Sequence, residues 1–308
     1  MDKKYLGVFF RGMAMGAADI VPGVSGGTIA LITGIYEELL NSLKSISPKS
    51  VGLMWQQSPK AFWQAINGTF LFSLLAGIVL SLISLSHVLT FLMAQYPILV
   101  WSFFFGLVAA SGFWLLKQCS LMKYQTGLFL IVGTIVAYLV TSGRPMQVEP
   151  TFLALFFSGA LAICAMILPG ISGSFILLLL GVYAPVLAAI KGLDLATMAV
   201  FGLGCATGLL SFVHILSYLL KRFHSQALAL LTGFLFGSLN ALWPWKQVLE
   251  FYTSSKGLEK PLIQVNVLPH QYTEISQQEP FIIPAILCAI LGAVVVLGLE
   301  FYSRKSGD

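Results

Sequence analysis

Two segments of the chain combine proline, glycine and hydroxyl side chains in a pattern that suits anion binding. Residues 20–36 read IVPGVSGGTIALITGIY, and residues 167–183 read ILPGISGSFILLLLGVY. Proline breaks a helix, glycine adopts unusual backbone angles, and a new helix can begin at the serine that follows them. The first amides of such a helix are unpaired and lie at the positive end of its dipole. This arrangement favours a phosphate or carboxylate ligand.

We expect both segments to contribute to one substrate-binding site. Small side chains let a ligand approach the backbone closely, and the hydroxyl groups add hydrogen-bond donors. The expected anion-binding residues are Ser25, Gly26, Gly27, Thr28, Ser172, Gly173 and Ser174, and the motif backbone is Pro22, Gly23, Pro169 and Gly170. A purely structural alternative is that Pro-Gly forms the tip of a re-entrant loop and that the serine caps the following helix.

Charged residues accompany only the first segment. Arg11 precedes it, and a guanidinium group suits bidentate phosphate binding, although Arg11 could instead anchor the chain at the cytoplasmic membrane surface. Asp19 lies three residues before Pro22, where an ionisable group inside a membrane is costly and is therefore a functional candidate. We consider Asp19, with Glu37 or Glu38, as a coupling or gating site for protons or sodium. Alternatively, Asp19 orders the glycine-rich loop, and the two glutamates are solvated at the membrane interface.

The composition shows that these segments must lie in a membrane. Only 9% of the 308 residues are charged, against about 25% in a typical soluble domain, and 57% are hydrophobic. The mean hydropathy is +0.89. Such a chain excludes soluble enzymes and nucleic-acid-binding proteins, and its solid apolar runs argue against a membrane β-barrel. At about 20 apolar residues per helix, the runs predict six full transmembrane helices and two interrupted segments.

Other sequence signals argue against a cleaved signal peptide and against a metal site. Arg11 and Asp19 interrupt the apolar core that a signal peptide needs, so we expect no cleaved signal. The cysteines do not have metal-ligand spacing, and three of them lie inside apolar runs. We therefore expect no metal ion and no cofactor.

The chain is predicted to be a tandem duplication. The two Pro-Gly segments match at an offset of 147 residues, and FFFGLVAA at 103–110 resembles FLFGSLNA at 234–241 at an offset of 131. The second offset also places Gly77 on Gly208, and residues 129–140 match residues 285–296 more loosely. We therefore predict an all-α polytopic membrane protein of two repeats, each a re-entrant, Pro-Gly-broken helical hairpin followed by three transmembrane helices.

The predicted boundaries follow from the apolar runs. Repeat 1 spans residues 1–150, with a hairpin at 5–43 and helices at about 65–94, 98–117 and 124–142. Repeat 2 spans residues 151–308, with a hairpin at 152–190 and helices at about 195–220, 225–243 and 281–302. Polar stretches near 44–64 and 246–279 interrupt the two repeats, and we expect the second to be an external loop or lid.

The distribution of basic residues favours re-entrant hairpins over hairpins that cross the membrane. If both are re-entrant, twelve basic residues face the cytoplasm and five face outside, as the positive-inside rule requires. The cytoplasmic set is Lys3, Lys4, Arg11, Lys44, Lys49, Lys60, Lys117, Lys123, Lys221, Arg222, Arg304 and Lys305, and the external set is Arg144, Lys191, Lys246, Lys256 and Lys260. If both hairpins crossed, this bias would largely disappear. Three crossings per repeat then invert the second repeat relative to the first and leave both termini in the cytoplasm.

The first motif resembles the signature of a bacterial and archaeal membrane family. It reads GAADIVPGVSGGT at residues 16–28, followed by GIY at 34–36, and the Pro-Gly-x-Ser-Gly motif at 169–173 also fits. Members of this family, formerly a domain of unknown function, are identified as undecaprenyl phosphate translocases of the PopT type. The resemblance covers nearly the whole chain.

The resemblance implies a protein of the bacterial inner membrane whose partner is a polyprenyl phosphate lipid. Undecaprenyl phosphate is the carrier of peptidoglycan and other surface polymers, and it must return from the outer to the cytoplasmic leaflet after each cycle. A translocase would hold the phosphate between the two hairpins while the tail stays in lipid.

Three other functions remain open on the residues alone. A secondary transporter or channel for a small soluble anion would use the same site, but it needs a polar path, and these helices carry few polar groups. An enzyme acting on a lipid phosphate needs a nucleophile or base with a partner, and no such constellation lies near the motifs. A non-transporting scaffold is disfavoured, because two helix breaks inside the bilayer cost free energy and would then serve no function.

Overall fold

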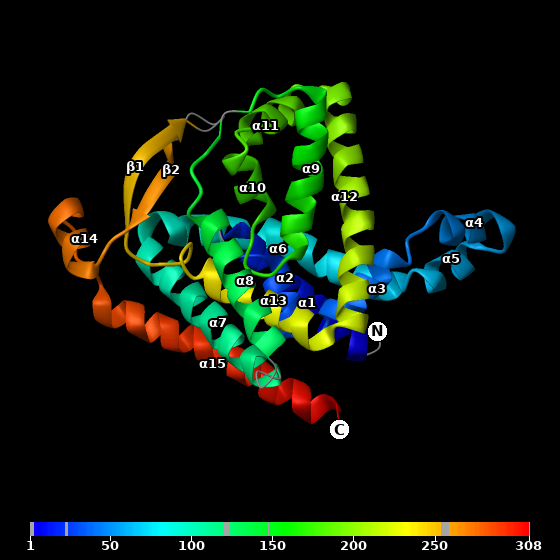
Figure 1. Cartoon of the computed structure of the whole chain (residues 1–308), viewed down its shortest axis with the longest axis horizontal. Helices are drawn as coiled ribbons and strands as arrows, with labels where there is room; N and C mark the ends of the chain where they lie inside the picture. Colours follow the sequence, from blue (N-terminus) through cyan, green and yellow to red (C-terminus); the bar gives the residue numbers. More distant parts are fainter. Residues whose placement is uncertain (1–2, 22–23, 120–123, 147, 254–258, 308) are drawn as a thin grey trace.

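The structure is a computed structural model that describes residues 3–21, 24–119, 124–146, 148–253 and 259–307. It is mostly helical (Figure 1). The first half contains α1 (Lys3–Ile20), α2 (Gly26–Ile32), α3 (Tyr36–Lys44), α4 (Pro48–Gln56), α5 (Pro59–Ala65), α6 (Gly68–Gln95), α7 (Pro97–Gln118) and α8 (Tyr124–Thr141). The second half contains α9 (Phe152–Ile167), α10 (Gly173–Leu179), α11 (Tyr183–Lys191), α12 (Leu195–Arg222), α13 (His224–Ser238), β1 (Lys246–Thr253), β2 (Glu259–Asn266), α14 (Pro269–Ser276) and α15 (Ile282–Gly307).

Among the described residues, four helices are long and apolar enough to cross a membrane, namely α6, α7, α8 and α12. The bent pair of α10 and α11 raises this number to five if the pair is counted as one span. The predicted helix at 225–243 is too long, because α13 ends at Ser238. Two turns follow it, and Pro244 cannot continue a helix.

Each Pro-Gly segment belongs to a unit of three helical pieces, whereas the sequence predicted a hairpin with one break. The second break follows α2 at Gly34 and α10 at Gly181, and both glycines have a φ of 72°. At each, the chain reverses through the same hydrogen bonds: Ile35 N–H donates to Ala30 O at 3.0 Å, and Val182 N–H donates to Leu177 O at 3.1 Å. Glycine adopts this left-handed C-terminal cap with the least strain. The first break includes Pro22 and Gly23, which lie outside the described residues.

Helix pairs of the two halves pack in the same way. α1 packs against α6 as α9 packs against α12, and α7 packs against α15 as α13 packs against α8. Glycines bring the first two pairs close together. A Cβ atom on Gly77 would lie 2.1 Å from Phe9 O, and one on Gly204 would lie 2.0 Å from Phe156 O. Phe9 and Phe156 are 147 residues apart, like the two Pro-Gly motifs, so Gly204 is the counterpart of Gly77.

This pairing corrects the predicted match of Gly77 with Gly208. The offset between α6 and α12 is 127 rather than 131, and both helices then contain 28 matched residues. The same offset matches Gly106 with Gly233. A Cβ atom on Gly106 would lie 1.9 Å from Ala289 O, and one on Gly233 would lie 2.3 Å from Leu130 O. The error is one helical turn, because Gly204 and Gly208 are four residues apart on one helix face.

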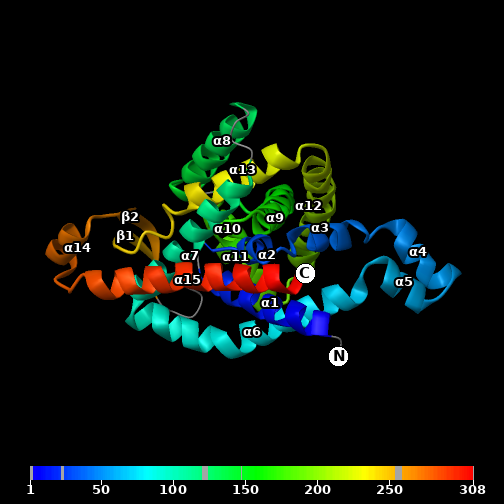
Figure 2. The same cartoon turned by 90° about the horizontal axis from the view of Figure 1, so that it is seen from below.

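The two polar insertions lie at opposite ends of the molecule. Helices α4 and α5 project at one end of the longest axis, and the β1–β2 hairpin with α14 lies at the other (Figures 1 and 2). Two bonds join the ends of this insertion, since Trp243 donates to Val267 O at 2.8 Å and Trp245 donates to Pro280 O at 2.8 Å. Lys246 fixes the base of the hairpin to α7, because its Nζ lies 3.9 Å from the ring centroid of Trp101. The expected external loop is therefore an ordered hairpin where the structure describes it.

The glycine contacts predict a position-specific loss of stability. Gly204→Ala places a methyl group against the backbone of Phe156, and overpacking of this kind costs about 1–3 kcal/mol. Gly202→Ala on the same helix meets no atom within 4 Å and is the matched control. We expect a lower unfolding temperature in detergent for Gly204→Ala and an unchanged one for Gly202→Ala. Equal temperatures would contradict the close approach of α12 and α9.

Candidate functional site

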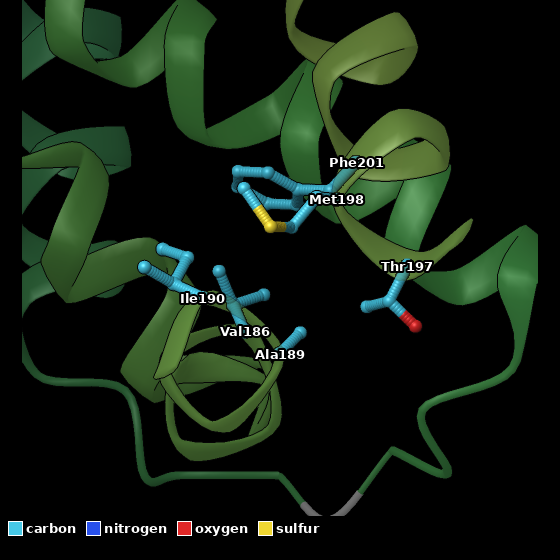
Figure 3. A pocket seen from close by; sticks show the side chains of 6 residues that line it. All are labelled: Val186, Ala189, Ile190, Thr197, Met198 and Phe201. Carbon is cyan, nitrogen blue, oxygen red and sulfur yellow. The ribbon is translucent and has the colours of Figure 1, made fainter. Parts of the chain in front are cut away.

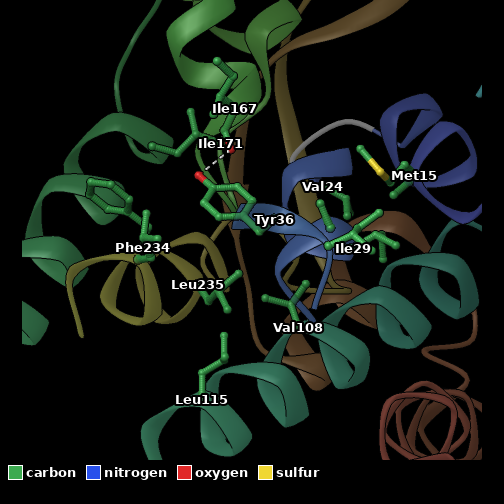
Figure 4. Close-up of a cluster of buried hydrophobic side chains, with 14 of the residues drawn as sticks. Met15, Val24, Ile29, Tyr36, Val108, Leu115, Ile167, Ile171, Phe234 and Leu235 are labelled. Atoms are coloured by element: carbon green, nitrogen blue, oxygen red, sulfur yellow. Dashed lines mark hydrogen bonds between the residues drawn. The ribbon is translucent and has the colours of Figure 1, made fainter. Parts of the chain in front are cut away.

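The two Pro-Gly segments meet in the centre of the protein and bind each other through side chains of the first half. Ser25 Oγ donates to Met166 O at 2.9 Å, and Tyr36 Oη donates to Ile167 O at 3.1 Å (Figure 4). Thr28 Oγ1 accepts from the Gly170 amide at 2.9 Å. The backbone at the end of α9 and in the loop that follows it therefore has hydrogen-bond partners on side chains of the first hairpin. Such partners are obligatory for backbone groups that a broken helix leaves unpaired inside a membrane.

Asp19 and Ser25 occupy the start of α2. The Gly26 amide donates to Asp19 Oδ1 at 2.6 Å, and the Gly27 amide donates to Ser25 Oγ at 3.1 Å. A Cβ atom on Gly26 would lie 2.7 Å from Asp19 Oδ2, so only glycine allows the carboxylate this close. The structure thus realises the alternative in which Asp19 orders the glycine-rich loop. Its role as a coupling site stays a prediction.

The predicted hydroxyl donors of the first segment are enclosed in this conformation. Ser25 and Thr28 have no exposed surface, and both hydroxyl groups have protein partners. Gly27 is equally confined, because a Cβ atom there would lie 2.4 Å from Ile167 O. Binding of a phosphate to these groups stays a prediction and requires the two hairpins to separate.

The second segment is less occupied at its helix start. Ser172 makes no capping bond to α10 and instead lies 2.9 Å from Ser174, hydroxyl to hydroxyl. Ser174 is exposed, whereas Ser172 and Gly173 are buried. Pro169 is buried, and Gly170 has a φ of 83° and packs against α13. The start of α10 therefore keeps hydroxyl groups that no backbone amide of its own helix uses.

Arg11 lies on α1 and is half-buried. It makes no hydrogen bond or ion pair with the part of the chain that the structure describes. An unpaired guanidinium group at partial burial favours an anionic partner, which keeps Arg11 as a candidate.

The two glutamates do not join Asp19. Glu38 lies 3.4 Å from Lys4 Nζ and accepts from Asn67 at 3.1 Å, and Glu37 lies 3.6 Å from His224. Lys4 and Asp19 stand near opposite ends of α1, about 22 Å apart at 1.5 Å per residue. The structure therefore separates the three predicted coupling residues into an interior carboxylate and two carboxylates near the start of α3.

An apolar pocket lies between α11 and α12 (Figure 3). Val186, Ala189 and Ile190 of α11 face Met198 and Phe201 of α12, and Thr197 contributes the one hydroxyl group of its lining. None of the predicted substrate-binding residues lines this pocket.

Sequence reasoning missed three groups of the interior contact. The carbonyl groups of Met166 and Ile167 carry no signal, because any residue type has one. Tyr36 did carry a signal, since it matches Tyr183 in the duplication, but its side chain was not expected to reach the other hairpin.

The comparisons with known proteins agree on one kind of protein. Residues 15–260 match a family model described as undecaprenyl phosphate translocase-like. A polyprenyl-phosphate transporter of Vibrio cholerae serotype O1 is 46% identical over 301 residues, which cover 98% of each chain. A polyprenyl-phosphate transporter of Staphylococcus aureus is 33% identical over 255 residues, which cover 76% of this chain and 84% of the relative. No solved structure matches the chain.

The interior contact predicts the effect of a single hydroxyl group. Thr28→Val keeps the shape of the side chain but leaves the Gly170 amide without its acceptor, which costs about 1–3 kcal/mol for a buried group. Thr28→Ser keeps the hydroxyl group and is the control. We expect thermal unfolding in detergent at a clearly lower temperature for Thr28→Val than for Thr28→Ser. If the serine variant were the less stable one, packing of the methyl group rather than the hydrogen bond would hold the hairpins together.

Proposed function

Since this chain belongs to the undecaprenyl phosphate translocase-like family, we propose that it moves undecaprenyl phosphate from the outer to the cytoplasmic leaflet. The observation that carries the proposal is the near full-length match to a polyprenyl-phosphate transporter. Return of this lipid would supply the carrier for peptidoglycan and other polymers of the cell envelope. The protein is a multi-pass membrane protein, and we propose the bacterial cytoplasmic membrane as its location.

We propose that residues 1–150 and 151–308 form two repeats of inverted orientation, with both termini in the cytoplasm. The matched packing of the helix pairs supports the repeats. Opposite placement of the two polar insertions supports the orientation, because α4 and α5 carry Lys49 and Lys60. Helix α1 begins and α15 ends in the half of the molecule that carries α4 and α5 (Figures 1 and 2). That half is then cytoplasmic, as the positive-inside rule requires.

The phosphate group would bind between the two hairpins. Arg11 provides a cation without an internal partner among the described residues, and Ser172, Gly173 and Ser174 provide a helix start whose two hydroxyl groups bond each other rather than the helix backbone. When the hairpins separate, Ser25, Gly26, Gly27 and Thr28 exchange their protein partners for phosphate oxygens. The breaks at Pro22, Gly23, Pro169 and Gly170 give the chain the turns that make this approach possible. The apolar tail remains in the lipid, so the tail needs no polar path through the protein.

Inward movement of the phosphate needs a source of free energy. An anion moving to the cytoplasm works against an inside-negative potential, at about 2.3 kcal/mol per charge per 100 mV. Binding of protons or sodium at Asp19 would offset this cost. Glu37 and Glu38 lie apart from Asp19 and would act at the hairpin end instead.

Recognition of the phosphate predicts a defined binding preference. We expect native mass spectrometry to show that the protein prefers undecaprenyl phosphate to undecaprenol, and that Arg11→Gln weakens phosphate-lipid binding about tenfold, since a charged hydrogen bond contributes about 1.5–3 kcal/mol. Arg144→Gln removes an exposed cation outside the proposed site and is the control. Equal binding of both lipids by the wild type would refute the phosphate site.

Coupling at Asp19 predicts different effects of two substitutions. Asp19→Asn retains an oxygen that accepts from the Gly26 amide but cannot release a proton. In vesicles loaded with fluorescent polyprenyl phosphate, we expect Asp19→Asn to fold normally and to lose the response of transport to proton or sodium gradients. Asp19→Ala loses the acceptor as well and should also be less stable. Wild-type transport that ignores both gradients would show that Asp19 only orders the loop.

A further inference from the structure

The packing of the two halves differs at one large contact. Helix α3 packs against α12, which belongs to the other half. Its counterparts are α11 and α6, and these two helices, both fully described, do not pack together in a comparable way. Figure 1 shows α3 beside the C-terminal end of α12 and α11 beside its N-terminal end. Helices α3 and α11, which match each other in sequence, therefore lie differently relative to the opposite half of the chain.

The α3–α12 contact is closed and partly polar. Leu40 of α3 and Leu220 of α12 are almost fully buried, with 1% and 5% of their surface exposed. Ser217, also buried, donates to Asn41 Oδ1 at 3.5 Å. Glu37 extends the contact to His224 at the start of α13, at 3.6 Å. The interface therefore combines long polar bonds with two leucines of the main apolar core.

The matched positions on α11 and α6 are more exposed than those of the closed contact. The glycine contacts described above give an offset of 147 residues between the two hairpins and 127 residues between α6 and α12. These two offsets identify the matched positions. Ala188 and Thr90 are exposed, and Leu187 and Met93 are half-buried. The matched pairs are Leu40 with Leu187, Asn41 with Ala188, Ser217 with Thr90, and Leu220 with Met93.

The open surfaces have the chemistry that a helix contact needs. Leu187 and Met93 stand where Leu40 and Leu220 stand in the closed contact, so the same apolar pairing is available to α11 and α6. Burial of such apolar side chains would stabilise a contact between the two helices. The small side chain of Ala188 presents no bulk that would hold the two helices apart.

We propose that the α3–α12 and α11–α6 surfaces are two alternating gates of the site between the hairpins, and that this structure is the state with the first gate closed. The inference rests on the proposed function for the identity of the substrate. In the proposed orientation, the closed gate lies beside Lys44 and Lys221 on the cytoplasmic side. The open gate then faces outside, so the state is the one that accepts lipid from the outer leaflet. Transport requires α11 to close on α6 while α3 leaves α12.

Two cysteine pairs test the gates in a protein whose four native cysteines are replaced by alanine. The pair Asn41→Cys with Ser217→Cys reports the closed gate, and the pair Thr90→Cys with Ala188→Cys reports the open one. In proteoliposomes treated with an oxidant, we expect rapid crosslinking of the first pair and slow crosslinking of the second. The first crosslink should abolish transport, and reduction should restore it. The four single-cysteine variants are the controls.

Weakening the closed gate tests whether the two gates are coupled, independently of the lipid. Leu220→Ala should speed crosslinking of the Thr90→Cys and Ala188→Cys pair about tenfold or more, because a destabilised state loses population to the other. An unchanged rate would overturn the proposal, as would full transport by protein crosslinked between positions 41 and 217. If crosslinking responds to Leu220→Ala but wild-type vesicles do not move undecaprenyl phosphate, the gates stand and the proposed function fails.

Discussion

The structure depends on one constraint: a helix broken inside a membrane must find new partners for its backbone groups. Water is absent there, so an unpaired carbonyl or amide costs several kcal/mol. The protein meets this constraint by placing two breaks against each other. Ser25, Thr28 and Tyr36 of the first hairpin bind the backbone at 166–170. The second break is therefore not complete without the first, and for this reason the two hairpins share the centre of the molecule.

The same contacts compete with the proposed binding of a phosphate at the centre. Hydroxyl groups that pair the hairpins are the groups best suited to hold a phosphate, and they cannot do both at once. Asp19 shows this competition most clearly, since it already occupies the amide of Gly26, at the positive end of α2. In the proposed mechanism, an entering phosphate therefore displaces these protein groups. Phosphate binding and separation of the hairpins are then one event in this proposal.

Much of this arrangement could be predicted from sequence, because the motif is duplicated and chemically distinctive. The Pro-Gly breaks, the mostly helical membrane fold and the resemblance to the family all follow from the residues. The second break at Gly34 and Gly181 was visible as a matched glycine, but a glycine in an apolar run does not reveal its backbone angle. The offset of α12 was wrong by one turn, since repeated glycines every four residues fit two registers equally well. The partners of Ser25 and Tyr36 could not be predicted, because main-chain carbonyl groups carry no residue identity.

The glycine-lined contacts also have a consequence for how the chain is assembled during synthesis. Helix α7 packs on α15 through Gly106, and α8 packs on α13 through Gly133, so each seam joins an early helix to a late one. Lipid cannot fill a groove shaped for a helix backbone as well as its partner helix does. The first half must therefore wait in the membrane with two unpaired surfaces until the ribosome has made the second half. A chain interrupted before α15 would keep the glycine-lined surface of α7 exposed to lipid.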